Sequence, residues 1–400
     1  MSWNQVNVLA ERVRFARSAL SEEQSFAALC RTFGISRRIG YKWLERFEAE
    51  GRAGLEDRSR APHRQARQCA PRWKERVLRL RRRHPRWGAK KLRAVLARQH
   101  RRAAVPAVRT LMQWIAEAGL VAPRPHRARR GPALPWPPLT VPTRANEVWT
   151  MDFKGWFRTG DGRRADPLTV RDLHSRFALG ICVLPNQEAA GVRRFCHRLF
   201  ARFGLPKIIR TDNGTPFAGT GALGLSQLSL GWLRLGIKVE FTRRARPGDN
   251  AAHEQFHRVL KAEAVNPPAA TAQQQQKRID TWVRHYNRKR PHEALGQRPP
   301  ASAYRRSARR MPAQVAEVRY PKSWAKRRVR QPGTIKWQGR ERFIGRAFAG
   351  QWVGLKALEP GVWKVRFAHL SVGQLHAKDS GGMRPARLVP QGKSVTHVSA

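Results

Sequence analysis

Between residue 147 and about residue 260, short apolar runs alternate with amphipathic stretches, and this pattern restricts the fold more than any other feature. In the first run, over residues 148–154, Trp149, Met151 and Phe153 share one face and Asp152 lies on the other. Four further strands are predicted, at 168–171, 177–184, 207–211 and 237–241. Helices are predicted between the later strands. The pattern therefore predicts an α/β domain with a mixed five-stranded sheet and helices packed on it.

In the segment before residue 120, apolar residues recur at the spacing of an α-helix instead. Ser21 and Gln24 form a capping box that predicts a helix start, and Ser36 can cap a second helix after a break at Gly34. These helices predict an all-α helix-turn-helix domain over residues 1–60, and similar spacing predicts a second one over residues 70–122. The apolar stripe of the second helix is expected at Ile39, Trp43 and Phe47, and its basic row at Arg37, Arg38, Lys42 and Arg46.

Proline and arginine mark the boundaries between the remaining segments. Residues 123–144 and 306–330 read as basic linkers, the first of them rich in proline. They flank a central domain at 145–305. Residues 331–390 hold short alternating runs punctuated by glycine, which predict a small β-barrel. The chain is therefore expected to be multidomain.

The charge of the chain indicates its partner. There are 80 Lys and Arg residues against 27 Asp and Glu residues, a formal net charge of +53 that is typical of proteins that bind nucleic acid. A hydrophobic fraction of 41% with 14 tryptophans favours a folded protein over a basic disordered tail. No apolar run of membrane-spanning length occurs, so we expect no membrane partner and a cytoplasmic, nucleoid-associated protein.

Three acidic residues stand out in this basic chain. Asp152 lies within the first strand, Asp212 directly follows a strand and precedes Asn213-Gly214, and Glu254 lies in the first turn of a helix. Cleavage of a phosphodiester needs an activated nucleophile and a neutralised leaving oxygen, which suits two divalent ions held by carboxylates. Each acid alone has a simpler explanation as a turn former or a helix-dipole partner. Together they predict a metal-dependent site.

Several matching stretches give the chain a resemblance to a known family. They are Trp149-Thr150-Met151-Asp152-Phe153, Thr211-Asp212-Asn213-Gly214, His253-Glu254-Gln255-Phe256-His257, Arg290-Pro291-His292-Glu293-Ala294-Leu295 and the N-terminal Tyr41-Lys42-Trp43-Leu44. With the first four stretches, residues 145–305 resemble the ribonuclease-H-like catalytic core of insertion-sequence transposases of the retroviral-integrase-like DDE class. The N-terminal stretch is similar to the helix-turn-helix of the same family. The loop at 246–252 is shorter than is usual in that family.

The resemblance implies a function and a set of site residues. Asp152, Asp212 and Glu254 would be catalytic and would bind two Mg²⁺ or Mn²⁺ ions, cutting the strand at a transposon end and joining it to target DNA. The partners would be double-stranded transposon-end and target DNA, bound by a dimer or tetramer. On the helix after Glu254, His257, Arg258 and Lys261 follow at helical spacing as expected DNA contacts.

Two other functions fit the same sequence. One is a DNA-binding regulator or architectural protein, derived from a transposase, whose core no longer catalyses. The other is a ribonuclease-H-like nuclease that acts on RNA hybrids or junctions, although two helix-turn-helix units favour duplex DNA.

Overall fold

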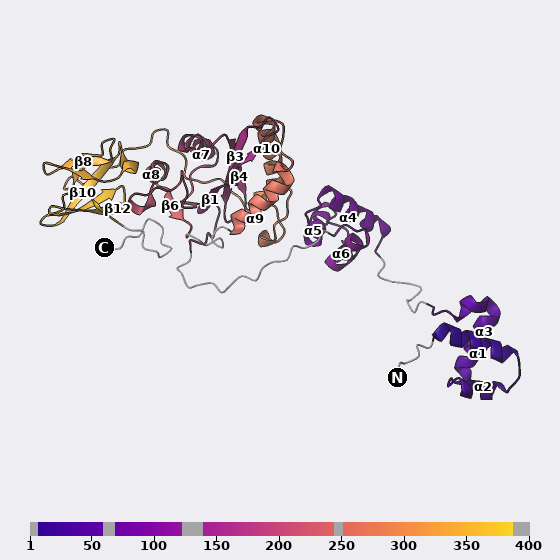
Figure 1. Ribbon diagram of the computed structural model, residues 1–400. Coiled ribbons are helices and arrows are strands. Elements are labelled where there is room, and N and C mark those ends of the chain that lie inside the picture. The colour runs from indigo at the N-terminus through magenta and orange to yellow at the C-terminus, as the bar shows by residue number, and fades with distance from the viewer. Residues whose placement is uncertain (1–6, 59–68, 122–138, 244–250, 387–400) are drawn as a thin grey trace. The chain divides into compact units, whose positions relative to one another are not determined.

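The computed structural model describes residues 7–58, 69–121, 139–243 and 251–386. The chain divides into two compact units, Met1–Ala70 and Pro71–Ala400 (Figure 1). Residues 123–138 of the first predicted linker lie outside the described ranges, as do residues 246–250 of the predicted short loop. Within those ranges, no helix combines the length and apolar character needed to cross a membrane.

The first unit consists of three α-helices around a small core. They are α1 (Val8–Leu20), α2 (Phe26–Thr32) and α3 (Arg37–Glu50), followed by the 3₁₀ turn η1 (Gly51–Leu55). Ser36 caps α3 as predicted, since its side chain accepts a hydrogen bond from the Ile39 amide at 3.3 Å. The predicted cap at Ser21 is wrong, because Ser21 ends α1 and the side chain of Ser25 caps α2.

The buried face of α3 differs from the predicted stripe. Ile39 is 44% exposed, whereas Gly40 is buried. A Cβ atom on Gly40 would lie 2.7 Å from the Cys30 Sγ atom and 3.0 Å from the Phe15 ring, so this position requires a residue without a side chain. The close approach of α3 to α1 and α2 therefore turns Ile39 outward.

The second unit begins with another three-helix cluster. Its helices are α4 (Pro71–Arg83), α5 (Ala89–Gln99) and α6 (Val108–Glu117). Trp73, Val77, Leu92, Leu111 and Ile115 form its core. All three helices lie within residues 70–122, the segment for which helical spacing predicts a domain.

A mixed sheet forms the centre of the second unit. Its strands are β1 (Val148–Phe153), β2 (Phe157–Arg158), β3 (Arg164–Asp172), β4 (Ala178–Leu184), β5 (Ile208–Thr211) and β6 (Lys238–Phe241). The order is β2-β3-β1-β5-β6, with β4 also paired to β3. β3 runs antiparallel to β1 and β4, whereas β1, β5 and β6 are mutually parallel. The mixed sheet is confirmed, but the predicted count of five strands is wrong because the two-residue β2 pairs with the start of β3.

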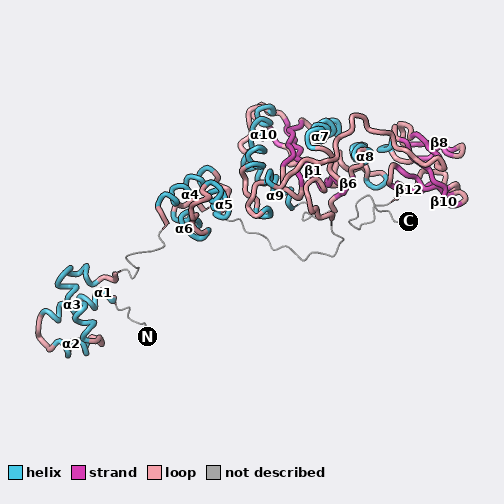
Figure 2. Tube along the Cα trace, turned by 180° about the vertical axis from the view of Figure 1, so that it is seen from behind, coloured by secondary structure: helices cyan, strands magenta, loops and turns pink. Residues whose placement is uncertain are grey.

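Helices cover both faces of this sheet (Figures 1 and 2). On one face, α7 (Ala189–Phe203) and α8 (Gln227–Arg234) pack with Trp149 and Met151. On the other, α9 (Ala251–Leu260), the π-helical turn η4 (Lys261–Val265) and α10 (Ala272–Arg288) pack against β4. The predicted alternation in β1 is confirmed, since Trp149 and Met151 face α7 and α8 and Thr150 faces α9.

The C-terminal region is a second, antiparallel sheet. Its strands are β7 (Ala325–Arg328), β10 (Trp352–Glu359), β11 (Val362–Phe367), β12 (Leu370–His376) and β13 (Arg384–Pro385), and β8 (Thr334–Trp337) pairs with β9 (Arg340–Phe343) as a separate ribbon. In the described part of the chain, β13 and β7 are the two ends of the strand order, so hydrogen bonding does not close the predicted barrel. β7 also lies inside the predicted linker 306–330, whose residue Ser307 donates its amide N–H to the Phe203 carbonyl.

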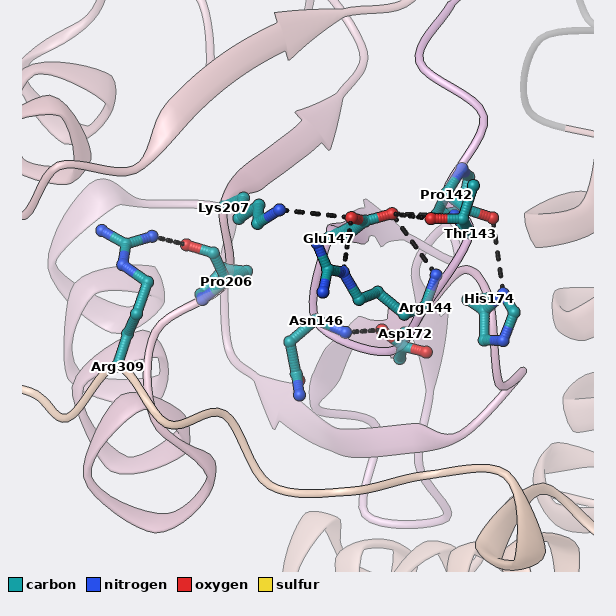
Figure 3. Close-up of polar contacts among 10 residues, drawn as sticks. All are labelled: Pro142, Thr143, Arg144, Asn146, Glu147, Asp172, His174, Pro206, Lys207 and Arg309. Carbon is teal, nitrogen blue, oxygen red and sulfur yellow. Dashed lines mark hydrogen bonds and ion pairs between the residues drawn. The ribbon is translucent and has the colours of Figure 1, made fainter.

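The segment that enters β1 is held by Glu147 (Figure 3). Its carboxylate accepts the Thr143 amide at 2.8 Å, the Arg144 guanidinium at 3.0 Å and the Lys207 ammonium at 3.2 Å. Lys207 immediately precedes β5, so these contacts hold the starts of β1 and β5 together. The Thr143 amide, aided by Arg144 and Lys207, lowers the pKa of Glu147 to about 2.

We expect Glu147→Gln to lower the free energy of unfolding by about 1–3 kcal/mol at neutral pH, because hydrogen bonds to a charged acceptor are removed. The folded pKa is depressed from 4.5 to about 2. The contribution is therefore complete above about pH 4.5 and is lost as the pH falls toward 2. Urea unfolding of wild type and variant between about pH 7 and 3 checks this. Glu22→Gln, at an exposed position, is the control, and a stability gap that does not change with pH contradicts the assignment.

Candidate active site

Asp152 and Asp212 lie at the same edge of the sheet. In the parallel pair β1–β5, Val148 is level with Ile208 and Thr150 with Arg210. Continuing this register two residues brings Asp212 level with Asp152, just beyond the end of β5. Asp212 accepts the Gly214 amide at 3.2 Å, so the turn predicted from Asn213-Gly214 holds its carboxylate at the strand end. Two of the three predicted acids therefore lie on neighbouring strands, Asp152 near the end of β1 and Asp212 directly after β5.

The third predicted acid is carried by α9, which is fixed to the sheet by buried polar contacts. His253 is 1% exposed, and its Nδ1 atom lies 3.0 Å from the Thr150 hydroxyl. Its Nε2 atom lies 2.5 Å from the hydroxyl of Thr169, the cross-strand neighbour of Asp152. The buried Arg171 guanidinium donates to the Ala252 carbonyl at 2.6 Å. These contacts set the rotation of the helix about its axis.

Glu254 and Arg258 lie on the outer side of α9, and Lys261 follows at the start of η4. Glu254, Arg258 and Lys261 are all exposed, as predicted for a face that offers an acid followed by cations. Lys154 follows β1. Burial, and to a smaller extent the nearby charge of Lys261, lowers the pKa of Lys154. The basic face of α9 therefore approaches the strand that carries Asp152.

His257 is placed differently from the other three members of this predicted face. Its Nε2 atom lies 2.8 Å from the Thr169 hydroxyl, so the ring turns toward the sheet. Burial, followed by the charges of Lys154 and Arg171, lowers its pKa to about 3. His257 is therefore neutral at neutral pH and is not one of the exposed cations.

The group of side chains close enough together to hold a metal ion differs from the predicted trio. Ligand atoms of Asp152, His253 and His257 all lie within 4.8 Å of one another. Among the described residues, neither Asp212 nor Glu254 belongs to such a group. Asp152 therefore belongs to two arrangements: it lies beside Asp212 at the sheet edge, and it lies beside His253 and His257 of α9.

Three of the residues that build this site are not predicted as site residues from the sequence. They are His253, Thr150 and Thr169, although two signals for them are present in the sequence. Thr150 lies two residues before Asp152 and so shares its face, and His253 and His257 are four residues apart and so share one face of a helix. Thr169 can be recognised as a site residue only from the pairing of β3 with β1, which places it opposite Asp152.

The segment that follows α9 supports this helix from behind. Tyr286 packs edge-on against Phe256 with ring centroids 5.1 Å apart. The side-chain amide of Asn287 exchanges two hydrogen bonds with the backbone of Ala178, at 2.9 and 2.8 Å. Arg290 pairs with Glu263 at 2.7 Å. This segment therefore has a structural function in holding α9 against the sheet.

The predicted basic row of the first unit lies on α3. Arg37, Arg38 and Lys42 are exposed. Arg46 is half-buried, with its guanidinium 5.3 Å from the Trp43 ring. Three of the four cations are therefore open to solvent.

Comparisons with protein families give matches over most of the chain. Two integrase core domain models match residues 142–247 and 235–300. The leucine-zipper of insertion element IS481 matches residues 11–83, and the C-terminal domain of IS481 family transposases matches residues 325–381.

Two curated relatives come from bacterial insertion elements. An uncharacterised 31.7 kDa protein of insertion element IS407 from Burkholderia multivorans is 32% identical over 238 residues, which cover 58% of this chain and 81% of the relative. An uncharacterised 39.2 kDa protein of insertion element IS476 from Xanthomonas euvesicatoria is 29% identical over 229 residues, which cover 56% of this chain and 62% of the relative.

Solved structures with similarity include two viral integrases. The HTLV-2 integrase catalytic core domain in complex with magnesium aligns with 12% identity and a TM-score of 0.33, covering 41% of this chain and 99% of that one. The simian T-cell lymphotropic virus intasome in complex with PP2A regulatory subunit B56 gamma aligns with 12% identity and a TM-score of 0.37, covering 78% and 98%.

Proposed function

The chain belongs to the insertion-sequence transposases of the integrase family, and on this basis we propose that it binds transposon-end DNA, cleaves it and transfers the cut strand into target DNA. The proposal rests mainly on one observation. Asp152 and Asp212 lie at the same edge of the sheet, and α9, which contains Glu254, packs beside the strand of Asp152. A site that offers carboxylates next to exposed cations suits a phosphodiester substrate.

The residues present fit a pair of hard divalent ions. Asp152 and Asp212 are both half-buried near the strand ends, so neither residue is closed off from solvent. In our proposal these two acids and Glu254 hold Mg²⁺ or Mn²⁺, which take carboxylate oxygens and keep several waters. When bound, such ions activate the attacking oxygen and neutralise the leaving oxygen of the phosphodiester.

The chain's own cations would position the DNA. Arg258 on α9 and Lys261 at the start of η4 are exposed, and we propose that they contact the phosphates on either side of the bond that is cut. Arg37, Arg38, Lys42 and Arg46 on α3 would contact the transposon end at a distance from the chemistry. Joining two ends to one target needs at least two active sites, so we propose a dimer or tetramer on DNA.

One observation favours a second function. Glu254 is exposed, and among the described residues it does not join Asp152 in a compact metal-binding group. A protein in which Glu254 never reaches the aspartates would bind DNA and regulate or organise it without cutting it. The two functions differ in whether DNA binding draws Glu254 toward the sheet edge.

Joining of a labelled end oligonucleotide to plasmid DNA separates the two functions. We expect the full-length protein to join the strands with Mg²⁺ or Mn²⁺ and to stop when EDTA is added, because the carboxylates alone cannot activate the attacking oxygen. Tight binding of the same oligonucleotide without joining under either metal favours the regulator.

A further inference from the structure

The contacts between α9 and β3 bring two imidazoles to one point. His253 and His257 are four residues apart, so both lie on the face of α9 that meets the sheet. Their Nε2 atoms lie 2.5 and 2.8 Å from the same atom, the Thr169 hydroxyl oxygen. Ligand atoms of both rings and of Asp152 lie within 4.8 Å of one another. Two nitrogens and a carboxylate oxygen thus converge on one small volume.

We propose that His253, His257 and Asp152 form a binding site for a nitrogen-preferring divalent metal ion such as Zn²⁺. Two histidines at this spacing on a helix, with a third ligand from another element, are a recurrent way of holding Zn²⁺. Mg²⁺ prefers oxygen ligands and is a poor match for two imidazoles. The site is therefore selective for a different class of ion from the one that the three carboxylates would hold.

Neighbouring side chains support this ligand set. When His253 binds an ion through Nε2, its Nδ1 atom carries the proton, and the Thr150 hydroxyl 3.0 Å away can accept it. Such an outer hydrogen bond fixes the orientation of a metal-binding ring. The Thr169 hydroxyl lies between the two rings, so it must rotate away or become an oxygen ligand of the ion. Asp152 and His257 are only half-buried, which leaves a route for the ion from solvent.

The shared use of Asp152 has a consequence for activity, and this consequence rests on the proposed transposase function. When an ion is bound by Asp152 and the two histidines, the Asp152 carboxylate is no longer available to bind an ion together with Asp212 at the sheet edge. Zn²⁺ should therefore inhibit joining supported by Mg²⁺. Replacing His257 should relieve the inhibition while leaving the three acids in place.

Binding of Co²⁺ tests the site without depending on activity. We expect untagged full-length protein to bind one equivalent of Co²⁺, with the visible absorption of low-coordinate Co²⁺ bound to nitrogen, and Zn²⁺ to displace it. A large excess of Mg²⁺ should not. His257→Asn should weaken Co²⁺ binding by at least about tenfold, because loss of an outer partner alone costs 10–100-fold. His197→Gln, which changes an exposed histidine on α7, should bind as wild type does.

Each outcome decides the proposal. Loss of the Co²⁺ spectrum in His257→Asn and in Asp152→Asn, with retention in His197→Gln, supports it. If the wild type shows no such spectrum, or if both site variants bind Co²⁺ as the wild type does, the three side chains form a hydrogen-bonded network only and the metal site is refuted. Circular dichroism shows whether each variant is folded. A protein that binds Co²⁺ as described but joins no DNA under Mg²⁺ keeps the metal site and loses the transposase function.

Discussion

Asp152→Asn is expected to lower the rate of strand joining at least ~10³-fold, as removal of a residue central to a catalytic group does. Asp152 lies beside Asp212 at the sheet edge and also beside His253 on the inner face of α9, so it takes part in both arrangements at the site. Asparagine keeps the size of the side chain but removes the negative charge that a divalent ion needs. Binding of end DNA should remain within about twofold, because phosphate contacts from Arg and Lys dominate the affinity.

Single-turnover joining of an end oligonucleotide, with binding measured in parallel, checks this expectation. Asp280→Asn is a matched control, since Asp280 is an exposed aspartate on α10. It should join DNA at the wild-type rate. Equal rates in Asp152→Asn and wild type would remove Asp152 from the chemistry.

The affinity for DNA is expected to fall by roughly 10³–10⁵ between 50 and 200 mM salt if the protein contacts six to ten phosphates. The reason is the net charge of +53, because each Lys or Arg that neutralises a phosphate releases a condensed counterion. Arg37, Arg38 and Lys42 are exposed on α3, so they are available for such contacts.

Fluorescence anisotropy of a labelled end duplex over this salt range measures the effect. Replacing Arg38 or Lys42 with alanine should lower the slope of log affinity against log salt by about one for each phosphate that the variant no longer neutralises. An affinity independent of salt would mean that the basic surface does not bind the DNA backbone. An unchanged slope in both variants would remove the predicted row on α3 from the interface.

The sheet could be predicted from the sequence because its strands are marked by local patterns. Trp149 and Met151 alternate with Thr150 and Asp152, and the two faces pack against different layers as that alternation requires. The strand before Asp212 ends at Thr211, as its apolar run indicates. Local capping signals were less reliable. Ser21 and Ser25 both precede α2, but α1 extends to Leu20 and ends at Ser21, so Ser25 is the residue that caps α2.

The arrangement around α9 could not be predicted in the same way. The spacing of Glu254, His257, Arg258 and Lys261 predicts a shared helix face, but the rotation of that helix depends on tertiary contacts. Thr150, Thr169 and Arg171 come from two strands and together turn His253 and His257 toward the sheet. A helical pattern contains no information about these partners, so the sequence could not separate His257 from the exposed cations.

The claim on which the function depends is that Asp152, Asp212 and Glu254 hold metal ions together when DNA is bound. Anomalous diffraction from Mn²⁺ in crystals of the full-length protein on its transposon-end DNA tests this most directly. We predict Mn²⁺ bonded to Asp152 and Asp212 at about 2.0–2.2 Å, with Glu254 completing the site from α9. Glu254 pointing into solvent in that complex, with no Mn²⁺ between the two aspartates, would contradict the account.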